Sequence, residues 1–464
     1  MAIEGHSRLR LIQQHLTRPV SILPLVLLRV VLGVLLCISM LRFVLNGWVH
    51  ALYGVPSVHF TYLGFDWVQP LPTPLLTAVY LLLAGLGLAI AAGWHYRLSI
   101  GAFCLLFTYT ELLDSTYYLN HYYFISLFTF LLLWLPLHRA AALDVRRHPP
   151  RACTTVPVWM LWAVQGQLAL VYVFAGIAKL NADWLLHALP LRIWLQEQLG
   201  VPVLGFWLGQ VWVAYAMSWG GMLFDLTVPV WLWWRRTRPY AYLAVLGFHA
   251  ITGWLFPIGM FPLLMIGCTL VFFDARDVAA ARQGLHRFTA LRLPPLLLPP
   301  TMATTATPPP RSLATLGRGL VVLLFLMVQL VLPLRHWAYA GDVLWNEAGF
   351  RFSWRVMLVE KTGSAMFVVS DPRSGQTWQV YPEDLLTPQQ AKQMAFQPDL
   401  IHGFAQHLAR QWRAQGYAAV QVYAEVWVSL NGRPAHRLVD PTVDLAQEPR
   451  RMGAPPWVLP RPVP

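Results

Sequence analysis

Five polar side chains are predicted to lie near the outer ends of apolar segments, where they could carry proton-transfer chemistry. They are Asn120, His121, Lys179, His249 and His336. Ionisable groups are costly inside a membrane, so each is a candidate functional residue. An amine with imidazole and amide partners could remove a proton from a substrate and stabilise the anion that remains.

Lys179 has the clearest chemistry of the five. It closes a long uncharged run in VYVFAGIAKLNADW (171–184). If the amine is shielded from water, burial favours its neutral form, which can accept a proton. The alternative is a lysine whose stem anchors a helix end while its charged head reaches the lipid headgroups.

The histidines leave two interpretations open. His121 lies among aromatic residues in LLDSTYYLNHYYF (112–124), and His249 lies in GFHAITGWLFPIGMF (247–261). Either could be an ordinary residue of the membrane interface. Asn120 favours a functional role for His121, because an amide can donate to a carbonyl or oxyanion. Glycine and proline after His249 predict irregular backbone, which is tolerated at membrane depth where it lines a cavity.

The composition requires a membrane fold to position these residues. Of 464 residues, 57% are hydrophobic and 12% are charged, with a mean hydropathy of +0.49. A soluble domain carries about 25% charged residues, so a soluble globular enzyme is excluded, as are disordered and disulfide-rich classes. We expect an α-helical polytopic membrane protein with a small C-terminal α+β domain. Nine spans are predicted, at about 22–41, 75–93, 98–113, 121–137, 157–178, 208–234, 240–255, 256–273 and 317–334.

Positive charge orients these spans. Arginine is concentrated in alternate connections, for example Arg139, Arg146, Arg147 and Arg151, whereas the connections 46–73 and 114–120 contain no Lys or Arg. This asymmetry follows the positive-inside rule, so the net charge of +13 does not indicate nucleic-acid binding. The first span shows no cleavage site and is predicted to be retained.

Three domains follow from this orientation. Residues 1–20 form a cytoplasmic segment, 21–334 the multi-span catalytic domain, which includes a proline-rich inner linker at 294–311, and 335–464 an extracytoplasmic domain. In the last domain we predict a hairpin between 367–370 and 377–381, a helix near Pro388 and a strand at 420–430. The predicted location is a bacterial cytoplasmic membrane with the C-terminal domain outside, and an endoplasmic reticulum membrane is the alternative.

No competing chemical motif is present in the sequence. It contains no phosphate-binding glycine loop, no HExxH and no GxSxG, and its histidines are not at metal-ligand spacing. We therefore expect a site without a metal ion.

Several long segments resemble the vitamin K-dependent γ-glutamyl carboxylases, in the family's order and near its spacing, from about residue 20 to about 450. The sequence is most similar to a short, bacterial-like member with an HTTM-type membrane domain. The matching segments are LLDSTYYLNHYYF (112–124), VYVFAGIAKLNADW (171–184), GGMLFDLTVP (220–229), FHAITGWLFPIGMF (248–261), LPLRHWAYAGDVLWNEAGFRFSWRVM (332–357) and EVWVSLNGRPAHRLVDPTVDL (425–445).

The resemblance implies a reaction and roles for residues. A lysine deprotonates reduced vitamin K, which reacts with O2 and becomes an epoxide through a strongly basic alkoxide. That base removes a γ-proton from peptidyl glutamate, and the carbanion captures CO2. By motif position, Lys179 is the base, and Asn120 and His121 position the quinone oxygen and support carboxylation. His249 and His336 line the vitamin pocket, and Trp354 lies in the segment associated with glutamate.

The sequence also departs from the animal members of the family. It is far shorter, lacks the region that binds the substrate propeptide, and has no cysteine in its outer domain. Val359 and Glu360 stand where animal enzymes have a histidine. Two alternatives therefore remain open: a quinone epoxidase without glutamate carboxylation, and a non-enzymatic membrane protein that binds or transports its ligand. The expected partners are the lipid bilayer, a quinone and a peptidyl glutamate.

Overall fold

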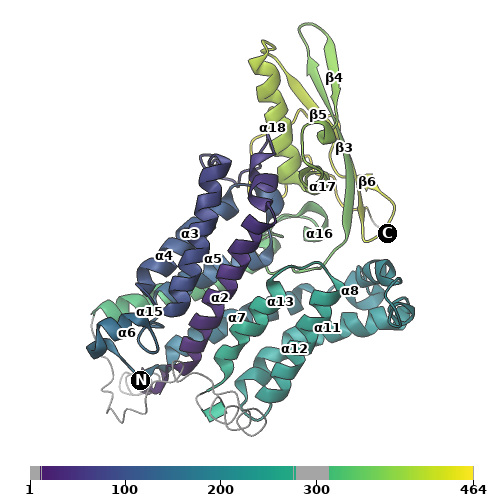
Figure 1. Cartoon of the computed structure of the whole chain (residues 1–464). Helices are drawn as coiled ribbons and strands as arrows, with labels where there is room; N and C mark the ends of the chain where they lie inside the picture. The colour runs from purple at the N-terminus through teal and green to yellow at the C-terminus, as the bar shows by residue number, and fades with distance from the viewer. Residues whose placement is uncertain (1–10, 12, 275, 278–312, 463–464) are drawn as a thin grey trace, which may run out of the picture.

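The computed structural model describes residues 11, 13–274, 276–277 and 313–462. The predicted inner linker at 294–311 and most of the N-terminal segment lie outside the described residues. Helices form a bundle, and a sheet with its covering helix stands at one end of it (Figure 1). The N-terminal end of the described chain lies at the opposite end of the bundle.

The bundle consists of two groups of helices that lie side by side (Figure 1). The first contains α2 (Leu23–Leu45), α3 (Thr73–Ala92), α4 (Tyr96–Leu112) and α5 (Asn120–Leu133), and the second contains α7 (Val158–Ala178), α11 (Val211–Trp233), α12 (Arg238–Leu255) and α13 (Phe261–Thr269). The last long helix is α15 (Leu313–Val331). In the first group α2 and α3 pack closely because Gly33 and Gly87 face the opposite backbone, where a Cβ would lie under 3 Å from it.

The predicted helical fold with a C-terminal region that contains strands is confirmed, but the count of nine spans is not. Each of the nine segments contains a helix. In the described part of the chain, four helices are long and apolar enough to cross a membrane: Leu23–Leu45, Thr73–Ala92, Val158–Ala178 and Leu316–Ala338. Tryptophan, tyrosine and glycine lower the hydropathy of α11 and α12. Pro262 stands in the first turn of α13, which spans only nine residues before a short 3-10 helix at Leu270–Phe272.

Short elements connect the long helices. On the side of the bundle away from the sheet, β1 (Pro19–Ser21) pairs with β2 (Thr155–Pro157), and α6 (Leu143–Arg147) lies nearby. Between α7 and α11, on the side of the sheet, are α8 (Ala182–His187), α9 (Leu191–Trp194) and α10 (Gly205–Leu208).

The C-terminal region forms a four-stranded antiparallel sheet of order β4-β3-β5-β6. Its elements are α16 (Val343–Asn346), β3 (Lys361–Asp371), β4 (Gln376–Val380), α17 (Pro388–Met394), α18 (Pro398–Ala414), β5 (Gln421–Leu430) and β6 (His436–Arg437). The predicted hairpin, helix start and strand are all confirmed. The buried residues of β3 and β5 alternate, and α18 covers that face, where Phe404 packs against Phe367.

Candidate functional site

An apolar cavity of about 100 Å³ lies between α7, α8, α9, α11, α12 and α13. Its aromatic wall contains Trp184, Trp194, Phe248, Phe256 and Phe261. The polar side chains that line it are Tyr172, Lys179, Asp225, His249 and Thr252. Such a cavity, mostly apolar with few polar groups, is typical of a small-molecule site.

Lys179 follows the last residue of α7, and its side chain is buried in this cavity. Its Nζ donates a hydrogen bond of 2.7 Å to Oδ2 of Asp225 and one of 3.2 Å to the carbonyl of Ala175. Nζ also lies 5.3 Å from the centre of the Trp184 ring. Lys179 is therefore not a lysine that reaches out to the headgroups, and its amine has a buried carboxyl partner.

Asp225 was missed in the sequence analysis, although it carried a signal. It is the only charged residue between Glu197 and Arg235, in the middle of a predicted span. An acidic residue in that position is a candidate functional residue by itself. Gly176 lets α7 approach α11 closely there, because a Cβ at Gly176 would lie 3.1 Å from the backbone nitrogen of Leu226.

His249, on α12, lines the cavity and is 2% exposed. Its Nε2 lies 3.0 Å from the hydroxyl of Tyr172, a second residue that sequence reasoning missed. Among the described residues, Nδ1 of His249 is buried and has no hydrogen-bond partner. A buried imidazole nitrogen without a partner is available to a ligand in the cavity.

Asn120 and His121 lie behind the cavity wall. The His121 ring lies 5.8 Å from the ring of Phe261, which in turn lies 5.9 Å from that of His249. Asn120 donates a hydrogen bond of 3.2 Å to the carbonyl of Arg355. In the described part of the chain no hydrogen bond joins either residue to Lys179, so the structure places them next to the lining residues and not next to the amine.

Trp354 and His336 are the two predicted residues of the C-terminal region. Trp354 is 1% exposed and packs on Tyr123, with ring centres 5.1 Å apart. It precedes Val356 and Met357, which line the cavity. His336 does not line the cavity, and its Nδ1 pairs with the carbonyl of Pro333.

Two family models match the chain, and together they cover most of the helical bundle and the C-terminal region. Residues 17–276 match the HTTM domain, and residues 317–463 match the lumenal domain of vitamin K-dependent gamma-carboxylase. The chain belongs to the vitamin K-dependent carboxylase family. No solved structure matches it.

Both family domains contribute to the cavity. Lys179, Asp225 and His249 come from the HTTM part, and Val356 and Met357 come from the part that matches the lumenal domain. The backbone of this carboxylase-family segment is strained, since Phe352, Trp354 and Met357 have positive φ angles of 60°, 57° and 47°. Each such residue costs about 1–3 kcal/mol, and strain of this kind clusters at functional sites.

A second and larger cavity, of about 670 Å³, lies between the loop 57–69, helix α18 and the segment 446–450. It is polar and contains none of the residues predicted from the sequence. In the described ranges of the chain, no group of three or more His, Cys, Asp or Glu side chains could hold a metal ion.

Proposed function

We propose that this membrane protein is a vitamin K-dependent γ-carboxylase that couples oxygenation of a hydroquinone to its epoxide with carboxylation of peptidyl glutamate. The observation that supports it most is the position of Lys179. In a chain with both domains of the carboxylase family, the amine faces an aromatic cavity and pairs with Asp225.

The lining of the cavity fits a hydroquinone ring. Aromatic side chains offer flat apolar walls, and Lys179 and the unpartnered Nδ1 of His249 offer polar atoms for ring oxygens. A cavity of roughly 150 Å³ holds a benzene ring, so the cavity of about 100 Å³ must widen to hold a two-ring headgroup. Phe261, between His249 and His121, is the wall residue whose movement would bring the cavity to His121.

Lys179 accepts the hydroxyl proton of the bound ligand in this proposal. Its neutral amine is the base, and the carboxylate of Asp225 stabilises the ammonium that forms, since a charge-assisted hydrogen bond of this kind is stronger than a neutral one. When bound, the hydroquinone supplies the electrons for reaction with O2, and that reaction provides the base that prepares glutamate for CO2. Tyr172 holds the imidazole of His249 in place.

The glutamate substrate reaches the cavity from the C-terminal region. Val356 and Met357 line the cavity directly, and Trp354 lies beside them. Asn120 bonds the carbonyl of Arg355 and thereby holds this segment against α5. His121 adjoins the wall at Phe261, where its imidazole would act on the carboxylation step once that wall opens. His336 lies outside the cavity, next to Gly349. The protein acts in a bilayer, which we propose is the bacterial cytoplasmic membrane, with this region on the outer side.

The test uses membranes that contain the full chain, reduced vitamin K, O2, labelled CO2 and a glutamate peptide. We expect the wild type to form epoxide and labelled peptide, and Lys179→Ala to lose about 10²–10⁴-fold in both. Lys392→Ala removes an exposed lysine and should leave both activities unchanged.

Other outcomes of this assay separate the alternatives. Epoxide without labelled peptide in the wild type would replace the proposal with a quinone epoxidase. Ligand binding without any turnover would favour a binding protein, and full activity of Lys179→Ala would refute the assigned base.

A further inference from the structure

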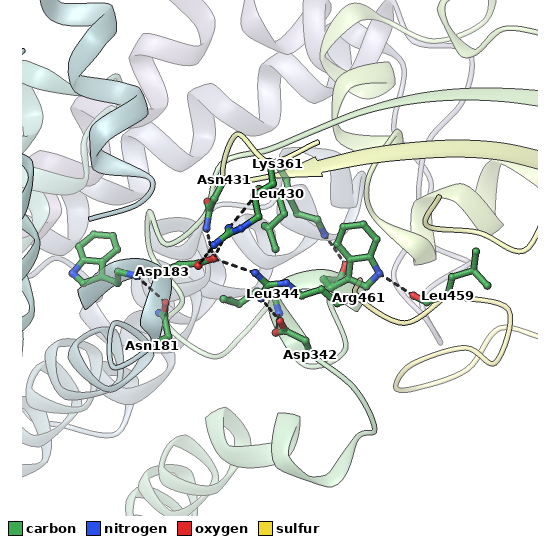
Figure 2. A network of polar contacts seen from close by, with 12 residues as sticks. Asn181, Asp183, Asp342, Leu344, Lys361, Leu430, Asn431, Leu459 and Arg461 are labelled. Atoms are coloured by element: carbon green, nitrogen blue, oxygen red, sulfur yellow. Dashed lines mark hydrogen bonds and ion pairs between the residues drawn. The ribbon is translucent and has the colours of Figure 1, made fainter. Parts of the chain in front are cut away.

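Asp183 is a buried carboxylate that links the lysine segment of the membrane region to the C-terminal region (Figure 2). It lies four residues after Lys179 and directly before Trp184, and both of those residues line the cavity. Sequence reasoning gave Asp183 no role.

Three side chains of the C-terminal region bind this one carboxylate. Arg433 donates through both terminal nitrogens, with Nη1 3.0 Å from Oδ2 and Nη2 in contact with Oδ1. Asn431 donates at 2.9 Å and Arg461 at 3.3 Å, both to Oδ2. Figure 2 shows Asn431 and Arg461 pointing toward Asp183. Two-pronged binding by arginine fixes direction as well as distance.

Two of the three donors, Asn431 and Arg433, sit on a tight turn between β5 and β6. Asn431 and Gly432 have φ angles of 54° and 72°, as a two-residue hairpin turn requires. The turn also contacts α9, because a Cβ at Gly432 would lie 3.2 Å from Cδ1 of Ile193. Asn431 accepts from the backbone nitrogen of Glu360, whose carboxylate accepts from Nε1 of Trp194 in the cavity wall.

The membrane side of the link is held by hydrogen bonds of its own. Asn181 caps α8 by accepting from the backbone nitrogen of Trp184, and it donates to the carbonyl of Ala178. Nε1 of Trp184 donates to the carbonyl of Ser218 on α11. Hydrogen bonds therefore connect both ends of the segment 178–184, which contains Lys179, and attach it to α11.

We propose that the β5–β6 turn, through Arg433 and Asn431, is a positioning element that holds Asp183 and thereby fixes Lys179 and Trp184 in the cavity. The C-terminal region then does more than present a substrate, because the geometry of the base depends on its docking. Arg433 is a positioning residue and touches neither the cavity nor the reacting atoms.

The chain offers a direct test, because it has only three lysines: Lys179, Lys361 and Lys392. Lys392 is exposed, whereas Lys179 and Lys361 are 6% and 5% exposed. Reductive methylation of the full-length protein in lipid nanodiscs, followed by mass spectrometry, gives a labelling rate for each amine. In the wild type, we expect Lys392 to react fastest.

In Arg433→Ala the labelling rate of Lys179 should rise about tenfold, a factor equivalent to 1.4 kcal/mol and near the low end for a hydrogen bond to a charged group. Lys361 and Lys392 should keep their wild-type rates. Asp183→Asn, which retains the size of the side chain, should show the same selective rise. Arg437→Ala is the matched control, since it removes an exposed arginine of β6 that pairs with Glu425.

Two results would overturn the inference: a wild-type rate for Lys179 in both Arg433→Ala and Asp183→Asn, or an equal rise at Lys361, which would mean general loosening of the C-terminal region. The catalytic consequence rests on the proposed function, but the labelling does not. If the wild type forms no epoxide and the selective rise is still seen, the proposed function fails and the positioning role stands.

Discussion

The amine of Lys179 and the carboxylate of Asp225 form a buried pair in which Nζ lies 2.7 Å from Oδ2. One residue comes from the end of α7 and the other from the middle of α11. The pair can accept a proton from a ligand only when the Lys179 amine is neutral and Asp225 is ionised. Its two members must therefore be treated as one base.

Asp225→Asn should abolish most turnover while leaving the cavity nearly unchanged in shape. The amide carries no charge and stabilises an ammonium less than a carboxylate does, so we expect a loss of about 10²-fold or more in epoxide formation. Removing one partner of a buried ion pair also costs about 3–5 kcal/mol of stability, so the melting temperature should fall. Glu111→Gln neutralises a carboxyl on α4 that does not line the cavity and is the matched control. Equal turnover in the two variants would contradict the role of Asp225.

Gly176→Ala should weaken the contact between Lys179 and Asp225 without replacing either residue. The added Cβ would meet Leu226, at 2.7 Å from its Cδ2 and 3.1 Å from its backbone nitrogen, and would push α11 away from α7. Overpacking of this kind costs about 1–3 kcal/mol, and turnover should fall about tenfold or more. Gly166→Ala on the same helix meets nothing within 4 Å and should behave as wild type. Matched turnover and melting temperature for the two variants would refute close helix approach as the requirement.

Tyr172→Phe should impair ligand binding more than the chemical step. The substitution removes the hydroxyl that lies 3.0 Å from Nε2 of His249 and frees the imidazole to rotate. A hydrogen bond contributes about 1 kcal/mol net, so KM for the hydroquinone should rise about fivefold with kcat little changed. Tyr242→Phe loses only a hydroxyl 3.4 Å from a backbone carbonyl and serves as the control. A fall in kcat at constant KM would assign Tyr172 to the reaction itself.

Acidification should destabilise the C-terminal region through His402. Burial lowers the pKa of His402 below its usual 6.5, although the hydrogen bond from its Nε2 to the Glu448 carbonyl opposes this shift. Because the unfolded chain binds the proton more readily, stability is lost as pH falls through 6.5. The fall in melting temperature between pH 7.5 and pH 5.5 should therefore be smaller for His402→Gln than for the wild type. The exposed His436, changed to Gln, is the control. Parallel pH curves for wild type and His402→Gln would contradict the assignment.

Local patterns in the sequence were sufficient to predict the helices and the hairpin and to single out Lys179 as a candidate functional residue. Uninterrupted apolar runs specify helices because a backbone in lipid must satisfy its own hydrogen bonds. Alternation of apolar residues in 420–430 specified β5, since successive side chains of a strand face opposite sides. The isolated charge of Lys179 marked a functional candidate, and the extended matches to the carboxylases identified the family.

The partners of these residues were decided by the tertiary structure alone. Asp225 lies 46 positions from Lys179, and Arg433 lies 250 positions from Asp183. No local pattern specifies which helix faces are adjacent, because that depends on close contacts such as the one between Gly176 and Leu226. The sequence placed Lys179, Asn120 and His121 near one another in depth, but depth is only one coordinate. Helix contacts decide where a residue lies in the plane across the bundle. They put Asp225 beside the Lys179 amine and put Asn120 and His121 behind the cavity wall.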